Sequence, residues 1–94
     1  MEYRKRTITE KQLNKLMGLA YWIADLHYIR EKYGADDPET ETCRKTIDLI
    51  FTELDALETP FSVQNMVIVW AENWRAYMAT TTKAFLETRN VKIA

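Results

Sequence analysis

The fold is decided by residues 8–38, which read ITEKQLNKLMGLAYWIADLHYIREKYGADDP. Thr9 is placed to accept a hydrogen bond from the backbone of Gln12, whose side chain can reach back to the backbone of Thr9. This reciprocal capping pattern predicts that a helix begins at Thr9. No proline interrupts the segment that follows, and Gly34 offers the positive φ that often ends a helix. We therefore predict a helix over residues 9–33.

A second helix is predicted over residues 37–58. Asp37 is a favoured N-cap residue, and Pro38 fits the first helical position because that position needs no backbone N–H donor. The helix must end before Pro60, since a proline disfavours helical geometry in the residue that precedes it. Its apolar residues recur at spacings of three and four, which is typical of a helix that packs along one face.

A third helix is predicted over residues 62–89, with Ser62 as its N-cap. It repeats the apolar spacing of the second helix. The line that results contains several aromatic residues: Val63, Val67, Trp70, Trp74 and Tyr77.

Three helices of similar length with short connections favour an up-down-up antiparallel bundle. We predict one all-α domain over residues 9–90, between a basic N-terminal arm (1–8) and a loose tail (91–94). A long antiparallel hairpin that dimerises is the alternative. Helices one and three carry more lines of apolar residues than a lone three-helix bundle can bury. A homo-oligomer, with a dimer as the simplest case, is therefore expected.

Composition is that of a soluble globular protein. The chain has 94 residues, of which 47% are hydrophobic and 29% charged. No apolar run approaches the ~20 residues of a membrane-spanning helix, so no membrane association is expected. A lone cysteine, Cys43, cannot form an internal disulfide, which favours a cytoplasmic location.

Charge is distributed unevenly along the chain. Residues 31–58 carry nine acidic and three basic residues, whereas the rest carries ten basic and five acidic residues. The simpler interpretation is an acidic middle helix packed between two more basic ones. The alternative is an acidic face that meets a basic partner or imitates nucleic acid.

Reaction chemistry is not indicated. His27 and Cys43 are the only residues of their types, so no His/Cys cluster has the spacing of a metal site. Nothing places a nucleophile beside a base and an orienting group, and no glycine-rich loop follows a strand. We therefore predict no catalytic residue, no metal, no cofactor and no enzymatic activity.

The predicted function is that of a helical protein-interaction module, acting as a regulator or inhibitor of an unidentified protein. Amphipathic rings beside a few polar groups are typical of interface hot spots. One face of helix one has this character, although the same face would also suit packing within the fold. The predicted partner-binding residues are Asn14, Gly18, Tyr21, Trp22, Asp25 and Tyr28.

Two alternative functions use other residues. Trp70, Trp74 and Tyr77 follow one another at helical spacing and would suit stacking of a small ligand, although this pattern is also typical of a core. A nucleic-acid-binding accessory protein would contact phosphates through the basic arm. The residues of that arm are Arg4, Lys5 and Arg6.

Overall fold

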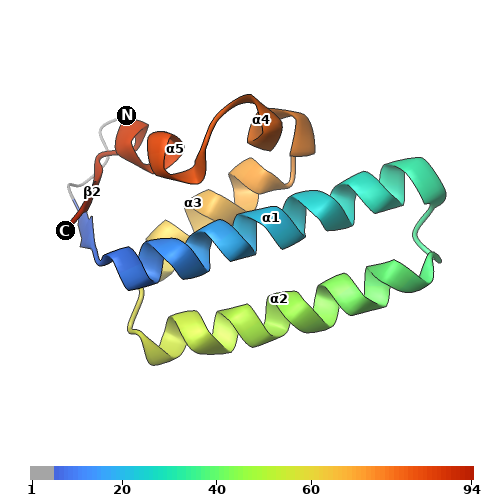
Figure 1. Cartoon of the computed structure of the whole chain (residues 1–94), viewed down its shortest axis with the longest axis horizontal. Coiled ribbons are helices and arrows are strands. Elements are labelled where there is room, and N and C mark those ends of the chain that lie inside the picture. Colours follow the sequence, from blue (N-terminus) through green and yellow to red (C-terminus); the bar gives the residue numbers. More distant parts are fainter. Residues whose placement is uncertain (1–5) are drawn as a thin grey trace.

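A computed structural model describes residues 6–94, and this part of the chain is mostly helical, as predicted. Its long central helix has neighbours on several sides (Figure 1). In chain order the elements are β1 (Arg6–Ile8), α1 (Glu10–Tyr33), α2 (Pro38–Ala56), α3 (Phe61–Ala71), α4 (Trp74–Ala79), α5 (Thr82–Thr88) and β2 (Val91–Ile93).

The first two helices begin as the sequence predicts. The Gln12 backbone N–H donates to Thr9 Oγ1 at 3.1 Å, and the Thr9 N–H donates to Gln12 Oε1 at 2.8 Å. Gly34 ends α1 with a φ of 93°. Asp37 caps α2 by accepting a hydrogen bond from the Glu39 N–H at 2.9 Å. These caps fix a tight turn that lays α2 antiparallel to α1 (Figure 1).

The prediction of one continuous helix over 62–89 is wrong. The first of the three helices ends at Ala71, and Asn73 caps the next by accepting hydrogen bonds from the backbone N–H groups of Arg75 and Ala76. Thr81 caps a further helix by accepting from the Ala84 N–H at 3.1 Å. Two side-chain caps therefore divide the segment into α3, α4 and α5.

The N-terminus of α3 also differs from the prediction. The helix begins at Phe61, directly after Pro60, and no side chain caps it. Ser62 therefore lies within the first turn and does not act as the N-cap. The Pro60 carbonyl accepts the first hydrogen bonds of the helix, from the backbone N–H groups of Val63 at 3.0 Å and Gln64 at 3.1 Å.

The breaks allow the chain to fold back over α1. α1 contacts α2, α3, α4 and α5, and α4 and α5 lie on the side of α1 away from α2 (Figure 1). The apolar excess of α1, from which we predicted a second copy of the chain, is thus partly covered by the same chain. The three-helix bundle is replaced by one long helix with four shorter helices around it.

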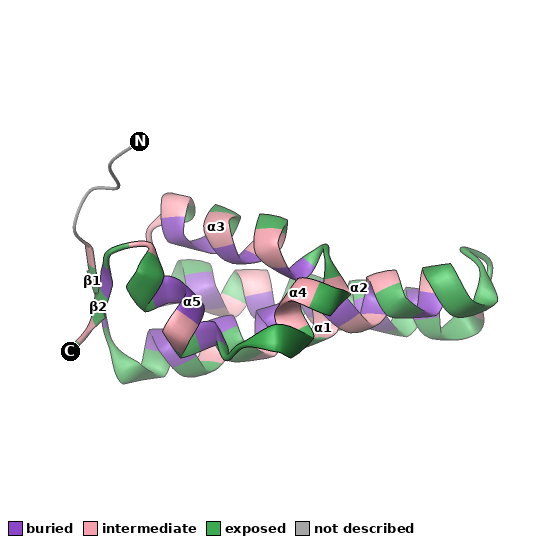
Figure 2. Cartoon of the chain, turned by 90° about the horizontal axis from the view of Figure 1, so that it is seen from above, coloured by how far each residue is buried: buried purple, intermediate pink, exposed green. Residues whose placement is uncertain are grey.

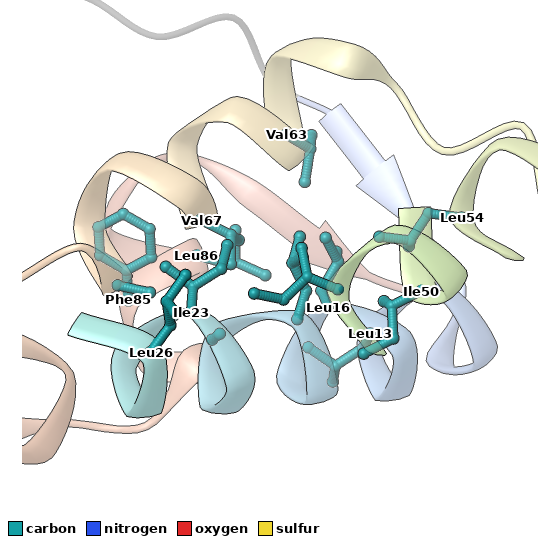
Figure 3. Packing of buried hydrophobic residues seen from close by; sticks show 14 of the residues in the cluster. Leu13, Leu16, Ile23, Leu26, Ile50, Leu54, Val63, Val67, Phe85 and Leu86 are labelled. Atoms are coloured by element: carbon teal, nitrogen blue, oxygen red, sulfur yellow. The ribbon is translucent and has the colours of Figure 1, made fainter. Parts of the chain in front are cut away.

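The core runs along the inner faces of these helices. Figure 2 shows buried residues facing inward on each long helix, and Figure 3 shows side chains of α1, α2, α3 and α5 meeting between them. The largest fully buried side chains are Ile8, Leu16, Leu19, Leu54, Leu86, Val63 and Val67, together with Cys43.

A small parallel strand pair joins the two ends of the described chain. β1 pairs with β2 in the register Arg6↔Val91, Thr7↔Lys92 and Ile8↔Ile93. Residues 91–93, predicted as a loose tail, are therefore ordered in a sheet. Within residues 6–94, no helix combines the length and the apolar character needed to cross a membrane.

Candidate binding groove between α1 and α4

One face of α1 carries large rings beside a carboxylate. Tyr21, Asp25 and Tyr28 follow one another at helical spacing and so lie in one line along the helix. Tyr21 and Tyr28 keep 51% and 36% of their surface exposed, and Asp25 is half-buried. Trp22 supports this line, because its ring meets that of Tyr21 edge to face with the centroids 5.3 Å apart.

α4 places a second set of large side chains opposite this line. The Trp74 ring meets the Tyr28 ring edge to face, with centroids 5.1 Å apart and planes at 86°. Between the two helices lies a hollow of about 330 Å³. Its walls are Tyr21, Ala24, Asp25 and Tyr28 of α1 and Trp74, Tyr77 and Met78 of α4.

The hollow continues toward the N-terminal half of α1. A second depression of about 580 Å³ shares Tyr21, Tyr77 and Met78 with the first and adds Met17 and Gly18. Thr80 and Thr81, which connect α4 with α5, and Thr82, the first residue of α5, also line it. We call the two depressions together the α1–α4 groove.

The groove gathers much of the exposed apolar surface. Four of the eight large apolar or aromatic residues exposed in the described chain line it. Met78 and Met17 keep 74% and 46% of their surface exposed, in addition to the two tyrosines. The remaining four are scattered over other elements: Tyr33, Leu49, Phe61 and Val69.

At one end of the groove, an acidic side chain of α1 is hydrogen-bonded to two residues of α4. Glu31, in the last turn of α1, accepts hydrogen bonds from Trp74 Nε1 and from both terminal nitrogens of Arg75. The Arg75 guanidinium also lies 4.3 Å from the centroid of the Trp74 ring. The hydrogen bonds from Arg75, and next the one from Trp74, lower the pKa of Glu31. We call these three residues the Glu31 cluster.

Asp25 connects the groove with α2. The Cys43 thiol points at the Asp25 carboxylate, with Sγ 3.8 Å from Oδ2. Burial raises the pKa of Cys43, and the negative charges of Asp25 and then Glu39 add to the effect. The thiol therefore stays protonated at neutral pH, which makes it a poor nucleophile.

The structure brings together residues that the sequence assigned to two separate sites. Of the predicted partner-binding residues, Gly18, Tyr21, Asp25 and Tyr28 line the groove, and Trp22 packs behind them. Asn14 is exposed on α1 but does not line it. A Cβ added at Gly18 would lie 3.7 Å from Ile50 Cδ1, an ordinary van der Waals distance.

Two of the three predicted ligand-stacking residues line the groove. Trp74 and Tyr77 line the groove, where they face α1. Trp70 instead stacks on Phe85, with centroids 4.5 Å apart and planes at 4°. It packs against the core there, and its ring also meets the Tyr77 ring, with centroids 5.5 Å apart and planes at 54°, so Tyr77 lies between Trp70 and the groove.

The predicted nucleic-acid contacts lie at the other end of the chain. Arg4 and Lys5 fall outside the described residues. Arg6 belongs to β1, where its backbone N–H donates to the Asn90 carbonyl at 3.2 Å. Its backbone is therefore used in joining the strand pair.

Sequence reasoning missed Met17, Met78 and Glu31 as parts of this site. Met78 lies one turn after Trp74, so helical spacing places the two on one face. Glu31 had no such signal, because its partners come from residues 74–75, which reach it only through the break at Asn73.

Neither a metal site nor similarity to known proteins assigns a function to this groove. Among residues 6–94, no group of three His, Cys, Asp or Glu side chains is placed to hold a metal ion. Comparison with protein-family models, curated proteins and solved structures found no match for this chain.

Proposed function

We propose that this protein is a non-enzymatic helical binding module that docks a protein partner in the α1–α4 groove and thereby regulates or inhibits it. The observation that carries the proposal is the gathering of exposed Met17, Tyr21, Tyr28 and Met78 in one groove. Contiguous apolar surface on a soluble protein usually marks a binding site. Tyrosine and tryptophan are enriched among interface hot spots, and flexible methionines adapt to a partner's shape.

The contacts between the two walls of the groove support the same proposal. Its two walls are helices, and the Tyr28–Trp74 contact and the Glu31 cluster tie one wall to the other. A surface that is already ordered loses less conformational entropy when a partner binds. The groove can therefore bind without first rearranging.

Differential capture tests the proposal. Wild-type protein, Tyr21→Ala and Met78→Ala would be used as bait in an extract of the native host, and a recovered partner would be purified and titrated by calorimetry. Both side chains are more than half exposed, so their removal should leave the fold intact. We expect each change to weaken binding by about tenfold or more.

Leu49→Ala and Tyr33→Ala are the matched controls. These residues are 60% and 68% exposed and lie outside the groove, on α2 and at the end of α1. Binding should survive both changes. If the controls weaken binding while the groove variants do not, the docking surface lies elsewhere on the molecule.

A small-ligand sensor is the second candidate, because one observation favours it. The hollow of about 330 Å³ falls in the size range of small-molecule sites and has Trp74 in its wall. A ligand that fills it would change the fluorescence of wild-type protein, and Trp74→Phe would abolish that change. A panel of metabolites that leaves the fluorescence unchanged would remove this candidate.

Self-association is proposed through a different surface. Phe61 and Val69 lie two turns apart on the outer face of α3 and keep 77% and 60% of their surface exposed. Partly buried Met66 and Ile68 neighbour them on the same helix. A symmetric dimer across α3 would cover this face and leave the α1–α4 groove free. Light scattering of wild-type protein and of Phe61→Asp tests this, because the variant should have the mass of one chain.

A further inference from the structure

The first hollow of the groove has the walls of a cation-binding pocket. Tyr21 and Tyr28 contribute rings from α1, and Trp74 and Tyr77 contribute rings from α4. The face of an aromatic ring carries partial negative charge and attracts a cation placed over it. Asp25 adds a full negative charge to the same wall.

The charge of Asp25 is not balanced by a cation of the described chain. Its hydrogen-bonding partner among residues 6–94 is the neutral Cys43 thiol, at 3.8 Å. Two other carboxylates on or beside α1 are balanced: Glu31 is paired with Arg75 and Glu53 with Lys15. A half-buried carboxylate among aromatic rings gains most from a cation that enters the pocket, because exclusion of water strengthens the attraction.

The surroundings also favour a positive ligand. Glu39 lies close enough to Cys43, and so to Asp25, for its charge to raise the pKa of the thiol. Residues 31–41, at the same end of α1 and α2, contain five acidic residues and one lysine. Arg75 lies near the pocket, but Glu31 already offsets its charge.

The chain already contains one example of the expected arrangement. Arg75 lies over the Trp74 ring while its guanidinium pairs with the Glu31 carboxylate. A planar guanidinium suits this arrangement because it stacks on rings and donates two parallel hydrogen bonds to a carboxylate. The pocket offers the same two elements, rings and a carboxylate, and no guanidinium of residues 6–94 lines it.

We propose that the pocket takes an arginine side chain of the protein partner, with its guanidinium between the tyrosine rings and the Asp25 carboxylate. This proposal rests on the groove being the docking surface. The second depression, along Met17 and Gly18, then holds apolar residues next to that arginine in the partner. The recognised feature is thus a basic residue flanked by apolar ones.

Small probes test the pocket without the partner. Propylguanidinium chloride, butylammonium chloride and neutral propylurea would each be titrated into the protein while the Trp74 indole N–H is followed by NMR. Trp74→Phe assigns that signal among the three tryptophans, and sodium chloride controls for ionic strength. We expect saturable shifts with propylguanidinium, weaker binding of butylammonium and none of propylurea.

Asp25→Asn separates charge from shape, because the amide keeps the size of the carboxylate. We expect it to weaken propylguanidinium binding by about tenfold. Asp48→Asn, at an exposed acid of α2 outside the pocket, is the matched control and should bind as wild type does. Equal binding of propylurea, no saturable shift with propylguanidinium, or unchanged binding by Asp25→Asn would each overturn the inference.

The outcome for the partner is distinguishable from the outcome for the pocket. A partner that is lost with Tyr21→Ala but retained in full by Asp25→Asn would uphold the docking surface and refute the arginine. A partner insensitive to Tyr21→Ala would refute the docking surface, whatever propylguanidinium does. Loss of the partner with both variants, together with retention by Asp48→Asn, is the result that supports both proposals.

Discussion

The Glu31 carboxylate and the Arg75 guanidinium form an ion pair, with Oε1 and Nη2 3.0 Å apart, that joins the last turn of α1 to the first turn of α4. This contact matters because α4 contains no buried residue. The helix is therefore held by contacts at the rim of the groove more than by the core. Elements with little buried surface are those that open first in a native protein.

We expect Glu31→Gln to loosen α4 while the rest of the fold persists. Hydrogen exchange followed by NMR should show faster exchange for the amides of residues 75–79 than in wild type, with the amides of α1 and α2 unchanged. Glu41→Gln, at an exposed acid of α2, is the control. Equal protection of α4 in wild type and Glu31→Gln would show that the ion pair does not hold the helix.

The effect of Glu31 should depend on pH. Arg75, and next Trp74, lower the pKa of Glu31 below its usual value. Because the folded-state pKa lies below the unfolded one, the stabilisation is fully present at neutral pH and disappears as the pH falls through the lowered pKa. Wild type and Glu31→Gln should thus differ in stability at pH 7 and converge in acid. If the difference in stability between wild type and Glu31→Gln stayed constant as the pH fell from 7 into acid, the ion pair would not be its cause.

Gly18→Ala should stabilise the protein. Gly18 lies inside α1, and a Cβ there would meet Ile50 Cδ1 at 3.7 Å, an ordinary van der Waals distance. Glycine costs a helix interior about 0.8–1 kcal/mol relative to alanine, so urea unfolding should show a gain of roughly 0.5–1 kcal/mol. A loss of stability would mean that the space beside Ile50 is tighter than this distance indicates.

Local signals predicted the first half of the fold well. The hydrogen bonds that start α1 and α2 connect residues at most three apart, so Thr9 and Asp37 could be identified from sequence. The break of the third helix also had a local signal, because Asn73 and Thr81 are both favoured N-cap residues. The apolar residues before and after Asn73 and Thr81 recur at helical spacing, which favoured one continuous helix over a break.

The strand pair had no readable signal. Each strand has three residues, and they pair across more than eighty positions of the chain. A run of three residues is too short to show alternation of apolar and polar side chains. The parallel register of the two strands depends on where α5 places residues 91–93, and only the complete fold determines that position.

The site was predicted in parts but not as a whole. The sequence indicated the line of Tyr21, Asp25 and Tyr28 and, separately, the rings of Trp74 and Tyr77. Spacing along one helix shows which side chains share a face, but not what faces them. The two sets of side chains line one groove only because the chain turns at Asn73, and that turn was not predicted.

Trp70 and Trp74 should respond differently to substitution. Trp70 stacks on Phe85 against the core, so Trp70→Ala should lower the free energy of unfolding by about 3 kcal/mol. Trp74 contacts Tyr28, Glu31 and Arg75 from an element without buried residues, so Trp74→Ala should cost much less stability but abolish binding in the groove. Urea unfolding followed by circular dichroism checks this order. If Trp74→Ala lowered the free energy of unfolding more than Trp70→Ala does, Trp74 and not Trp70 would be the structural tryptophan.

The strand pair should contribute measurably to global stability through Ile8. This side chain is 1% exposed and belongs to the core cluster, while the carbonyl of Ile8 accepts a hydrogen bond from the Ala94 N–H at 2.8 Å. Ile8→Ala leaves a cavity and should lower the free energy of unfolding by roughly 2–4 kcal/mol.

Thr7→Ala is its matched control, because Thr7 lies in the same strand with its side chain exposed. It should change stability by less than about 0.5 kcal/mol. Both variants would be measured by urea unfolding, with the slope of the transition compared to wild type. If Ile8→Ala changed the free energy of unfolding as little as Thr7→Ala does, the strand pair would open independently of the core. A large loss with an unchanged slope would instead show that the core includes the strand pair, because the same surface then unfolds in one cooperative transition.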